Sequence, residues 1–444
     1  MTIASRGRRT RVRHEPSTAR IIRRRSRGAH VAVAMIAALV APSLLVGQPP
    51  RAASAGPKAQ RCMDSVATVT PARLDAKHMI YVEQETVVAQ PDGRVLVAGR
   101  PVFVWRDEGD RYEMLTVDSL FGMVVDSTSS SVRAIPSPFP GRHLDGMRAA
   151  ALPDGWWLAT FAEVFPAKMP QHPIVKQMWA GETDGTRWRR VRKLPTLVDS
   201  IDTMDMSALV YRDGRARLAA PAPRGAFKYA EIYSLDHDRW TVRSENLRFA
   251  TYVNLSLSAT HDLMAVVRPA EIPGTTDVNS LYLFAKRAED SVWTQRAWIV
   301  VGGNRSVRDP QFSGTDSRLL SWRRTTDDGS NWDAWFATVD DRGDSIGEVT
   351  RVSPGAIEVG VASRGANHVW AVFDRARETR PTLRMVERGP APDLALVERL
   401  TDYAGLIGVA IARDRVVVIA SQPSSHPRDP QVISVVRTHT WRCQ

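Results

Sequence analysis

The stretch ETVVAQPDGRVLVAG at residues 85–99 contains a complete β-hairpin signal. A short apolar run comes first, a tight turn follows at Pro91-Asp92-Gly93, and a more apolar, Val-rich run ends it. Asp and Gly favour tight turns, and Val favours strands, because of their backbone and side-chain geometry. The stretch therefore predicts two antiparallel strands joined by a short turn.

The same unit recurs along the whole chain after the first 55 residues. Its further copies are RAAALPDGWWLATF at 148, SALVYRDGRARLAAP at 207, LSLSATHDLMAVV at 255, QFSGTDSRLLSW at 311, GVASRGANHVWAVF at 360 and GVAIARDRVVVIA at 408. The turns fall near residues 92, 154, 213, 261, 316, 366 and 413. No long 3.6-residue apolar period interrupts them, so the chain is expected to be all-β.

Seven units of roughly 50 residues are typical of a β-propeller with four strands in each blade. Small residues in the first strand of each unit suit the crowded innermost position. We therefore predict a seven-bladed propeller of four-stranded antiparallel blades, with a six-bladed ring as the alternative. A pair of β-sandwiches gives no reason for one hairpin to recur seven times.

The two cysteines, Cys62 and Cys443, lie near the two ends of the body of the chain. If the segment after Cys62 forms the outer strand of the last blade, it pairs beside the final stretch VISVVRTHTWRC and closes the ring. That pairing would also satisfy strand edges that an open array leaves exposed. We expect a disulfide between the two cysteines, since an exported protein can keep one; two free thiols are the alternative.

The basic charge of the chain belongs to its first 55 residues. The chain has 444 residues and a formal net charge of +12, but residues 1–55 contain 11 Arg and one acid, Glu15. The remainder has 49 basic and 47 acidic residues, a net charge of +2. The body therefore gives no bulk-charge argument for nucleic acid as a partner.

Residues 1–55 have the order of a secretory signal peptide. The arginine cluster ends at Arg27, an apolar run covers residues 29–47, and Ala53-Ser54-Ala55 is a small-x-small cleavage site. We expect cleavage and export by a bacterium to the periplasm or the medium, by the general or the twin-arginine route. An uncleaved membrane anchor is the alternative, and only that case implies a membrane partner. Residues 56–444 then form a single propeller domain.

One turn carries a recognisable motif. Residues 325–332 read TTDDGSNW and resemble the Asp box, S/T-x-D-x-G-x-T-W, with Asn331 at the Thr position. Weaker echoes are GETDGTRW at 181 and SLDHDRW at 234. The chain thus resembles the sialidase-like propeller superfamily with Asp-box (BNR) repeats, in which the box is structural and distant from catalysis.

The resemblance to sialidases stops short of their complete catalytic motifs. The family's F/Y-R-I-P would fall at Tyr81-Val82-Glu83-Gln84-Glu85, which contains no Arg. Arg148 and Arg308 begin later inner strands and could join an arginine cluster, and Tyr403 loosely resembles the family's late tyrosine nucleophile. The resemblance implies a glycan-related propeller and leaves enzymatic activity open.

A polar residue occurs seven to nine positions before the first-hairpin turn in six of the seven units. These residues are Glu85, Asp145, Asp205, Asn254, Asp309 and Glu358. They would begin the innermost strands and surround one mouth of the channel. With Arg148, Arg308 and Tyr403 they are the candidate ligand-binding residues; capping of strand ends in contact with solvent is the alternative interpretation.

The favoured function is binding of a small polar ligand, a glycan or a protein at this acidic mouth. The alternative is a glycoside hydrolase that uses two of the carboxylates, whose separation would determine retention or inversion. The 10 His residues show no metal-ligand spacing, and no P-loop, dinucleotide fingerprint or nucleophile elbow occurs. We therefore expect no metal, no cofactor, no nucleic-acid partner and a monomer.

Overall fold

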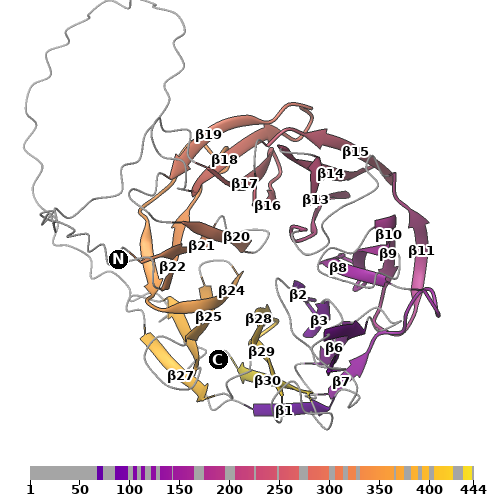
Figure 1. The fold of residues 1–444 in the computed structure, drawn as a ribbon, viewed down its shortest axis with the longest axis vertical. Coiled ribbons are helices and arrows are strands. Elements are labelled where there is room, and N and C mark those ends of the chain that lie inside the picture. The colour runs from indigo at the N-terminus through magenta and orange to yellow at the C-terminus, as the bar shows by residue number, and fades with distance from the viewer. Residues whose placement is uncertain are drawn as a thin grey trace, which may run out of the picture.

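The structure is a computed structural model, and it shows a ring of sheets around a central axis (Figure 1). The residues it describes are 68–73, 86–98, 104–107, 112–115, 122–126, 131–142, 144–164, 175–195, 206–224, 227–247, 250–269, 279–299, 306–313, 319–326, 331–364, 367–374, 382–388, 393–399, 405–423 and 434–442. Within these ranges every regular element is a β-strand. The predicted signal peptide, residues 1–55, lies outside them.

The described strands form seven four-stranded antiparallel sheets, the blades, and one extra two-stranded hairpin. The first three blades contain β2 (Thr86–Ala89), β3 (Arg94–Ala98), β6 (Gly122–Asp126) and β7 (Ser131–Ala134); β8 (Leu144–Ala151), β9 (Trp157–Val164), β10 (Val175–Thr183) and β11 (Trp188–Lys193); and β12 (Val210–Arg212), β13 (Arg215–Arg224), β14 (Phe227–Asp236) and β15 (Arg239–Glu245). The extra hairpin, β4 (Val104–Asp107) with β5 (Tyr112–Leu115), lies in the chain between β3 and β6.

Blades 4 to 6 follow the same plan, and blade 7 takes one strand from the other end of the chain. Their strands are β16 (Tyr252–Leu257), β17 (His261–Pro269), β18 (Asn279–Arg287) and β19 (Thr294–Ile299); β20 (Val307–Ser313), β21 (Leu319–Thr325), β22 (Trp332–Thr338) and β23 (Thr350–Ser353); β24 (Ala356–Arg364), β25 (Asn367–Asp374), β26 (Thr382–Arg388) and β27 (Asp393–Arg399); and β28 (Gly405–Ala412), β29 (Arg415–Pro423), β30 (Ser434–Arg442) and β1 (Thr68–Arg73). The seven-bladed prediction is confirmed.

The N-terminal strand closes the ring as the sequence predicts. β1 pairs antiparallel with β30, from Thr68 opposite Thr440 to Arg73 opposite Val435, and becomes the outermost strand of blade 7 (Figure 1). Both ends of the chain thereby share one sheet. Cys62 and Cys443 lie outside the described residues, so their disulfide stays a prediction.

The innermost strands contact one another in ring order, β2, β8, β12, β16, β20, β24, β28 and again β2. Two glycines allow close approaches between these strands. A Cβ on Gly408 would lie 2.6 Å from Cγ2 of Val87, and one on Gly360 would lie 3.4 Å from Cα of Gly408. The small residues of the first strands are therefore a consequence of crowding at the axis, as expected.

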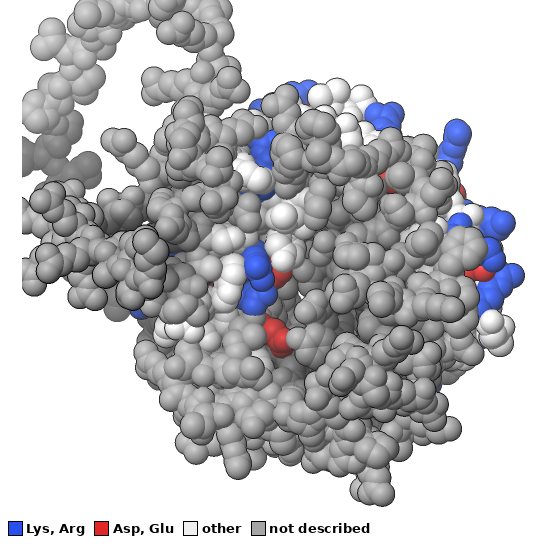
Figure 2. All heavy atoms as spheres, in the orientation of Figure 1, with Lys and Arg blue, Asp and Glu red and all other residues white. Residues whose placement is uncertain are grey.

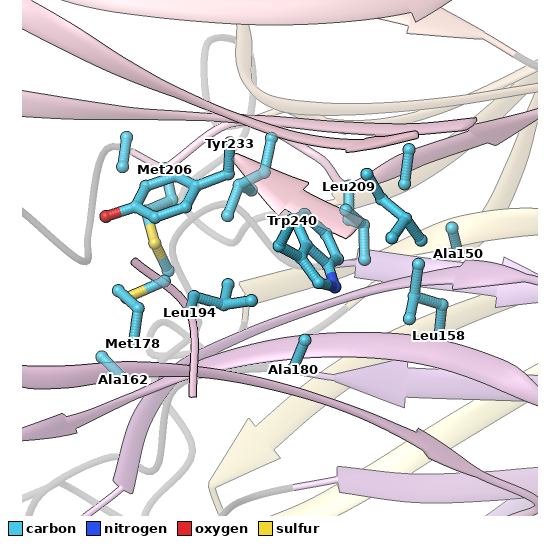
Figure 3. Packing of buried hydrophobic residues seen from close by; sticks show 14 of the residues in the cluster. Ala150, Leu158, Ala162, Met178, Ala180, Leu194, Met206, Leu209, Tyr233 and Trp240 are labelled. Atoms are coloured by element: carbon cyan, nitrogen blue, oxygen red, sulfur yellow. The ribbon is translucent and has the colours of Figure 1, made fainter. Parts of the chain in front are cut away.

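The apolar core lies between the faces of neighbouring blades. Between blades 2 and 3, Ala150, Leu158, Met178 and Ala180 come from one blade, and Leu209, Tyr233 and Trp240 come from the next (Figure 3). Burying one such aliphatic side chain stabilises the fold by about 1.5–3 kcal/mol. Because each sheet buries both faces against neighbours, its strands contain continuous apolar runs.

An ionic network, which we call the junction network, joins blades 3 and 4. The carboxylate of Asp262 is fully buried and lies 3.0 Å from Nη1 of Arg215, 3.1 Å from Nε of Arg217 and 3.1 Å from Nζ of Lys286. Arg217 also donates to the Leu235 carbonyl at 3.2 Å. Every charge in this network has partners within the protein, so its role is structural.

Blade 1 has a related contact at the first residue of its second strand, the position that Arg215 occupies in blade 3. Arg94 begins β3 and donates to the carbonyl oxygens of Gly155, at 2.8 Å, and Asp184, at 3.1 Å, both in turns of blade 2. Its guanidinium lies 5.0 Å from the ring centroid of Trp157. The arginine that follows a first-hairpin turn therefore connects its blade to the next one.

Candidate functional site

The predicted site lies where the innermost strands begin. Every blade starts with its innermost strand, and the blades repeat around the axis, so these starts gather at one mouth of the channel. The innermost strands β20 and β24 run in the same direction. Ser313 and Ser363, each near the end of its strand, lie side by side with their Oγ atoms 2.9 Å apart. Figure 2 shows a hollow at the centre of the ring with acidic and basic side chains beside it.

Backbone irregularities mark this mouth. The pairing of the innermost strand with its neighbour shifts between Asp145 and Arg148 in β8, Arg308 and Gln311 in β20, Ala356 and Glu358 in β24, and Leu406 and Gly408 in β28. Such bulges re-aim side chains and are frequent beside functional sites. Three of the predicted polar residues, Asp145, Asp309 and Glu358, therefore lie at bulges.

Asp145 and Arg148 are buried at the start of blade 2. Asp145 is 6% exposed and accepts a hydrogen bond from the backbone N–H of Gly146 at 2.8 Å. Arg148 is 3% exposed and donates to the carbonyl oxygen of Met206, at 3.3 Å, in the segment that leads into blade 3. The contact of Arg148 with Met206 holds the inner end of blade 2 against its neighbour, whereas the hydrogen bond of Asp145 is local to β8.

Asn254 makes a similar contact between blades 4 and 5. Its side chain is 8% exposed, and its Oδ1 accepts a hydrogen bond from the backbone N–H of Phe312 at 3.2 Å. Asn254 therefore bridges β16 and β20. With Asp145 and Arg148 it forms a buried, internally bonded part of the predicted set.

Four side chains form a different arrangement at the start of blade 5, which we call the mouth cluster: Arg308, Asp309, Arg323 and Trp332. Arg308 is exposed, and its guanidinium carbon lies 4.7 Å from the Trp332 ring centroid. Arg323 lies 5.6 Å from the same centroid and donates through Nε to Asp309 Oδ2 at 2.6 Å. A second nitrogen of Arg323 also contacts that oxygen.

The backbone explains how these groups meet. Arg308 and Arg323 are register partners on β20 and β21, and Trp332 begins β22, the next strand of the sheet. Asp309 has a φ of 49°, a left-handed conformation that Asp tolerates better than most residues. This conformation occurs inside the bulge, where Asp309 is paired with Arg323 and Arg308 stays exposed.

Arg308 is the chemically available group of the cluster. Among the described residues its guanidinium contacts the ring of Trp332 and no carboxylate. A stacked, exposed guanidinium is held in orientation and keeps its donors for a carboxylate, phosphate or hydroxyl group. Glu358 is half-buried at the bulge of β24, the innermost strand of the next blade, which contacts β20.

The remaining candidates lie outside the described residues. These are Glu85, Asp205 and Tyr403, together with Cys62 and Cys443. Sequence reasoning missed Arg323 and assigned Trp332 only to the box. The register of β20 with β21 was the missing information, because it brings Arg323 to Asp309 across the sheet.

The turn whose sequence resembles the Asp box joins β21 and β22, the second and third strands of blade 5. Thr326 N–H donates to the Asn331 carbonyl at 2.8 Å, and Asn331 N–H donates to Thr326 Oγ1 at 3.1 Å. Residues 327–330 lie outside the described ranges.

A clearer carboxylate-capped turn occurs at the weaker echo, between β10 and β11. There Asp184 Oδ1 accepts from the backbone N–H groups of Thr186, at 2.7 Å, and Arg187, at 3.0 Å. Burial raises the pKa of Asp184, but the hydrogen bonds from Thr186 and Arg187 outweigh it and lower the pKa to about 2.

No group of three or more His, Cys, Asp or Glu side chains in the described ranges is placed to hold a metal ion. In the same part of the chain, no helix is long and apolar enough to cross a membrane.

Comparison with known proteins identifies the architecture. No family model matches the sequence, and no significantly similar curated protein was found. Among solved structures, a protein of unknown function from Dyadobacter fermentans has a TM-score of 0.50 at 12% identity, over 86% of this chain and 99% of that one. At this identity the likeness shows the fold alone.

Other structural neighbours include sialidases. The phage phi92 endosialidase has a TM-score of 0.49 at 10% identity, over 86% of this chain and 70% of that one. A Trypanosoma rangeli sialidase mutant displaying trans-sialidase activity has a TM-score of 0.41 at 8% identity, over 84% and 59% of the two chains. These two scores are too low to support an argument about activity, and the class that the fold defines is the β-propeller.

Proposed function

We propose that this protein is an exported propeller that binds a polar ligand, most readily a glycan, at the mouth cluster. The observation that carries the proposal is the exposed guanidinium of Arg308, held against Trp332 beside the Asp309–Arg323 pair. Convergent polar groups beside an aromatic ring at a channel mouth form a typical ligand site. Glycan hydroxyl and carboxylate groups match the donors of Arg308 and the acceptors of Asp309 and Glu358.

Binding can be tested by calorimetry with neutral and carboxylate-bearing oligosaccharides. We expect Arg308→Ala to weaken binding about tenfold or more, since a charge-assisted hydrogen bond contributes about 1.5–3 kcal/mol. Arg239→Ala removes another exposed arginine, from the outer strand of blade 3, and should leave affinity unchanged. Equal affinities for wild type and Arg308→Ala would contradict the proposal.

A glycoside hydrolase is the second candidate. The observation that favours it is the left-handed backbone of Asp309 at a bulge, because such strained positions are concentrated at functional sites. Turnover of aryl glycosides, a sialoside included, would be measured for wild type, for Asp309→Asn and for Asp290→Asn, a control in a blade 4 hairpin. Turnover lost only in Asp309→Asn would establish the enzyme over the binding protein.

Export is part of the proposal. Protein recovered from the expressing bacterium should begin after Ala55 and appear in the periplasm or the medium. N-terminal sequencing and cell fractionation test this directly. An intact N-terminus in the membrane fraction would instead establish the uncleaved anchor.

A further inference from the structure

The outermost strand of blade 2 differs from the other outer strands in its charge. β11 reads WRRVRK and contains four cations and no acid, and Arg187 precedes it. By contrast, β7, β19 and β23 each carry one arginine, and β15 carries two with one acid. Figure 2 shows Lys and Arg side chains gathered on the rim where Figure 1 places β11.

Residues 187–193 form a basic segment that we call the strip, and several of its cations are exposed to solvent. The side chain of Arg187 is 76% exposed and that of Arg190 is 68% exposed, and each makes one surface ion pair, with Asp184 at 3.3 Å and with Glu182 at 3.2 Å. Lys193 is exposed, and its Nζ lies 5.6 Å from the Trp179 ring centroid. The acids beside them, Asp154, Glu182 and Asp184, are fewer than the cations, so the strip keeps a net positive charge.

Aromatic and ionic contacts fix the orientation of two arginine side chains in the strip. Arg189 lies 3.9 Å from the Trp156 ring centroid and is paired with Glu182 at 2.6 Å and with Asp154. Arg187 contacts the same ring at 5.5 Å. Aromatic stacking and ion pairs orient the guanidinium planes before any partner arrives.

Arg190 is presented by a distorted backbone. The pairing of β10 with β11 shifts between Ala180 and Glu182, so Arg190 and Val191 both oppose Gly181. Arg190 has a φ of 51°, a conformation that a long side chain rarely adopts. A bulged edge strand rich in arginine resists pairing with another strand, which disfavours an extended peptide as the partner.

We propose that this strip, Arg187 to Lys193, binds an acidic polysaccharide along the rim of the propeller. Seven residues of strand extend over about 20 Å, and their side chains alternate between the two faces of the sheet. Arg192 lies on the side of blade 3, where it donates to the Asp238 carbonyl, and Lys193 lies on the opposite side with Trp179. The cations therefore flank both sides of this outer edge, and a linear polyanion that follows the edge contacts both sets. Trp156 is already contacted by two guanidinium groups, so it is a poor platform for stacking nucleic-acid bases. Val292, the single large exposed apolar side chain among the described residues, lies in blade 4, so the strip lacks an apolar anchor for a lipid surface.

The test measures binding of heparin and polygalacturonate to the full chain by calorimetry at several salt concentrations. The variant Arg187→Gln, Arg190→Gln, Lys193→Gln should bind about tenfold or more weakly, with a shallower salt dependence, because three cations are lost. The control Arg239→Gln, Arg243→Gln, Arg351→Gln removes three exposed arginines from other outer strands and should bind as wild type does. Unchanged thermal unfolding would show that both variants fold.

Several outcomes would overturn the proposal. These are absence of polysaccharide binding by wild type, an equal loss in the control variant, or stronger binding to phosphatidylglycerol vesicles or to a single-stranded oligonucleotide. In preparations that keep the basic leader, it is common to all variants and cancels in the comparison, and the processed form, which begins after Ala55, should show the same difference. Arg308→Ala should keep full heparin binding, which separates this strip from the mouth cluster.

Discussion

The junction network and the mouth cluster are both built from arginines and an aspartate, yet they have opposite relations to solvent. In the junction network, Asp262 is fully buried and has three cationic partners within 3.1 Å. In the mouth cluster, Asp309 is half-buried and paired with Arg323, and Arg308 lies exposed against Trp332. The difference shows that the availability of donors, more than the presence of arginine, separates a structural cluster from a candidate binding site.

The largest effect is expected for Asp262→Ala. The substitution leaves Arg215, Arg217 and Lys286 as a buried cationic group without its carboxylate. Removing one partner of a buried ion pair costs about 3–5 kcal/mol of unfolding free energy. Urea denaturation measures the loss, and a change below about 1 kcal/mol would mean that solvent reaches this junction.

A second test concerns ring closure, which lies in blade 7, away from both clusters. β1 and β30 pair near both cysteines in the chain, and we predict that Cys62 and Cys443 form a disulfide. Cys62→Ser should then lower the free energy of unfolding by about 2–4 kcal/mol under non-reducing conditions. The same variant compared in reducing buffer should show no difference. Alkylation of both cysteines in the unreduced wild type would refute the bond.

A smaller, pH-dependent effect is expected at Asp184, which caps the turn before β11. Its pKa of about 2 lies below its ordinary value of 3.8, so its contribution is complete above pH 4 and is lost as the pH falls toward 2. Asp184→Asn should lower the free energy of unfolding by about 1–2 kcal/mol at pH 7. In this variant the free energy of unfolding should also change less as the pH falls from 4 to 2. Asp92→Asn is the control in another turn. Parallel pH profiles for wild type and Asp184→Asn would contradict this assignment.

The smallest effect on stability is expected for Arg308→Ala. An exposed side chain without an ion pair among the described residues should change the unfolding free energy by less than about 0.5 kcal/mol. Ligand affinity should fall in the same variant. A variant that loses stability and affinity together would place the mouth cluster with the junction network as a structural element.

Much of the fold follows from local sequence. Each turn signal, such as Pro91-Asp92-Gly93 or Arg413-Asp414, specifies a hairpin through residues that are neighbours in the chain. The recurrence of seven hairpins at roughly 50-residue intervals then predicts the ring, and the position of the N-terminal segment predicts its closure by β1. The extra hairpin of β4 and β5 was not foreseen, because the spacing shows only that this unit is longer.

The candidate site follows from the sequence only in part. The spacing places Asp145, Asn254 and Asp309 near the starts of innermost strands, and the structure has them there. It does not indicate that Arg148 and Asn254 are buried in bonds to neighbouring segments, or that Arg323 reaches Asp309. Those contacts join residues on different strands or blades, so bulges and register decide them.

The sequence by itself determined the strand content, the number of repeated blade units and the segment that closes the ring, because turn and strand preferences act between chain neighbours. The tertiary structure decided which charges are neutralised inside and which face solvent. That outcome depends on how each blade packs against the next, and no local pattern encodes the distance between two side chains on different sheets.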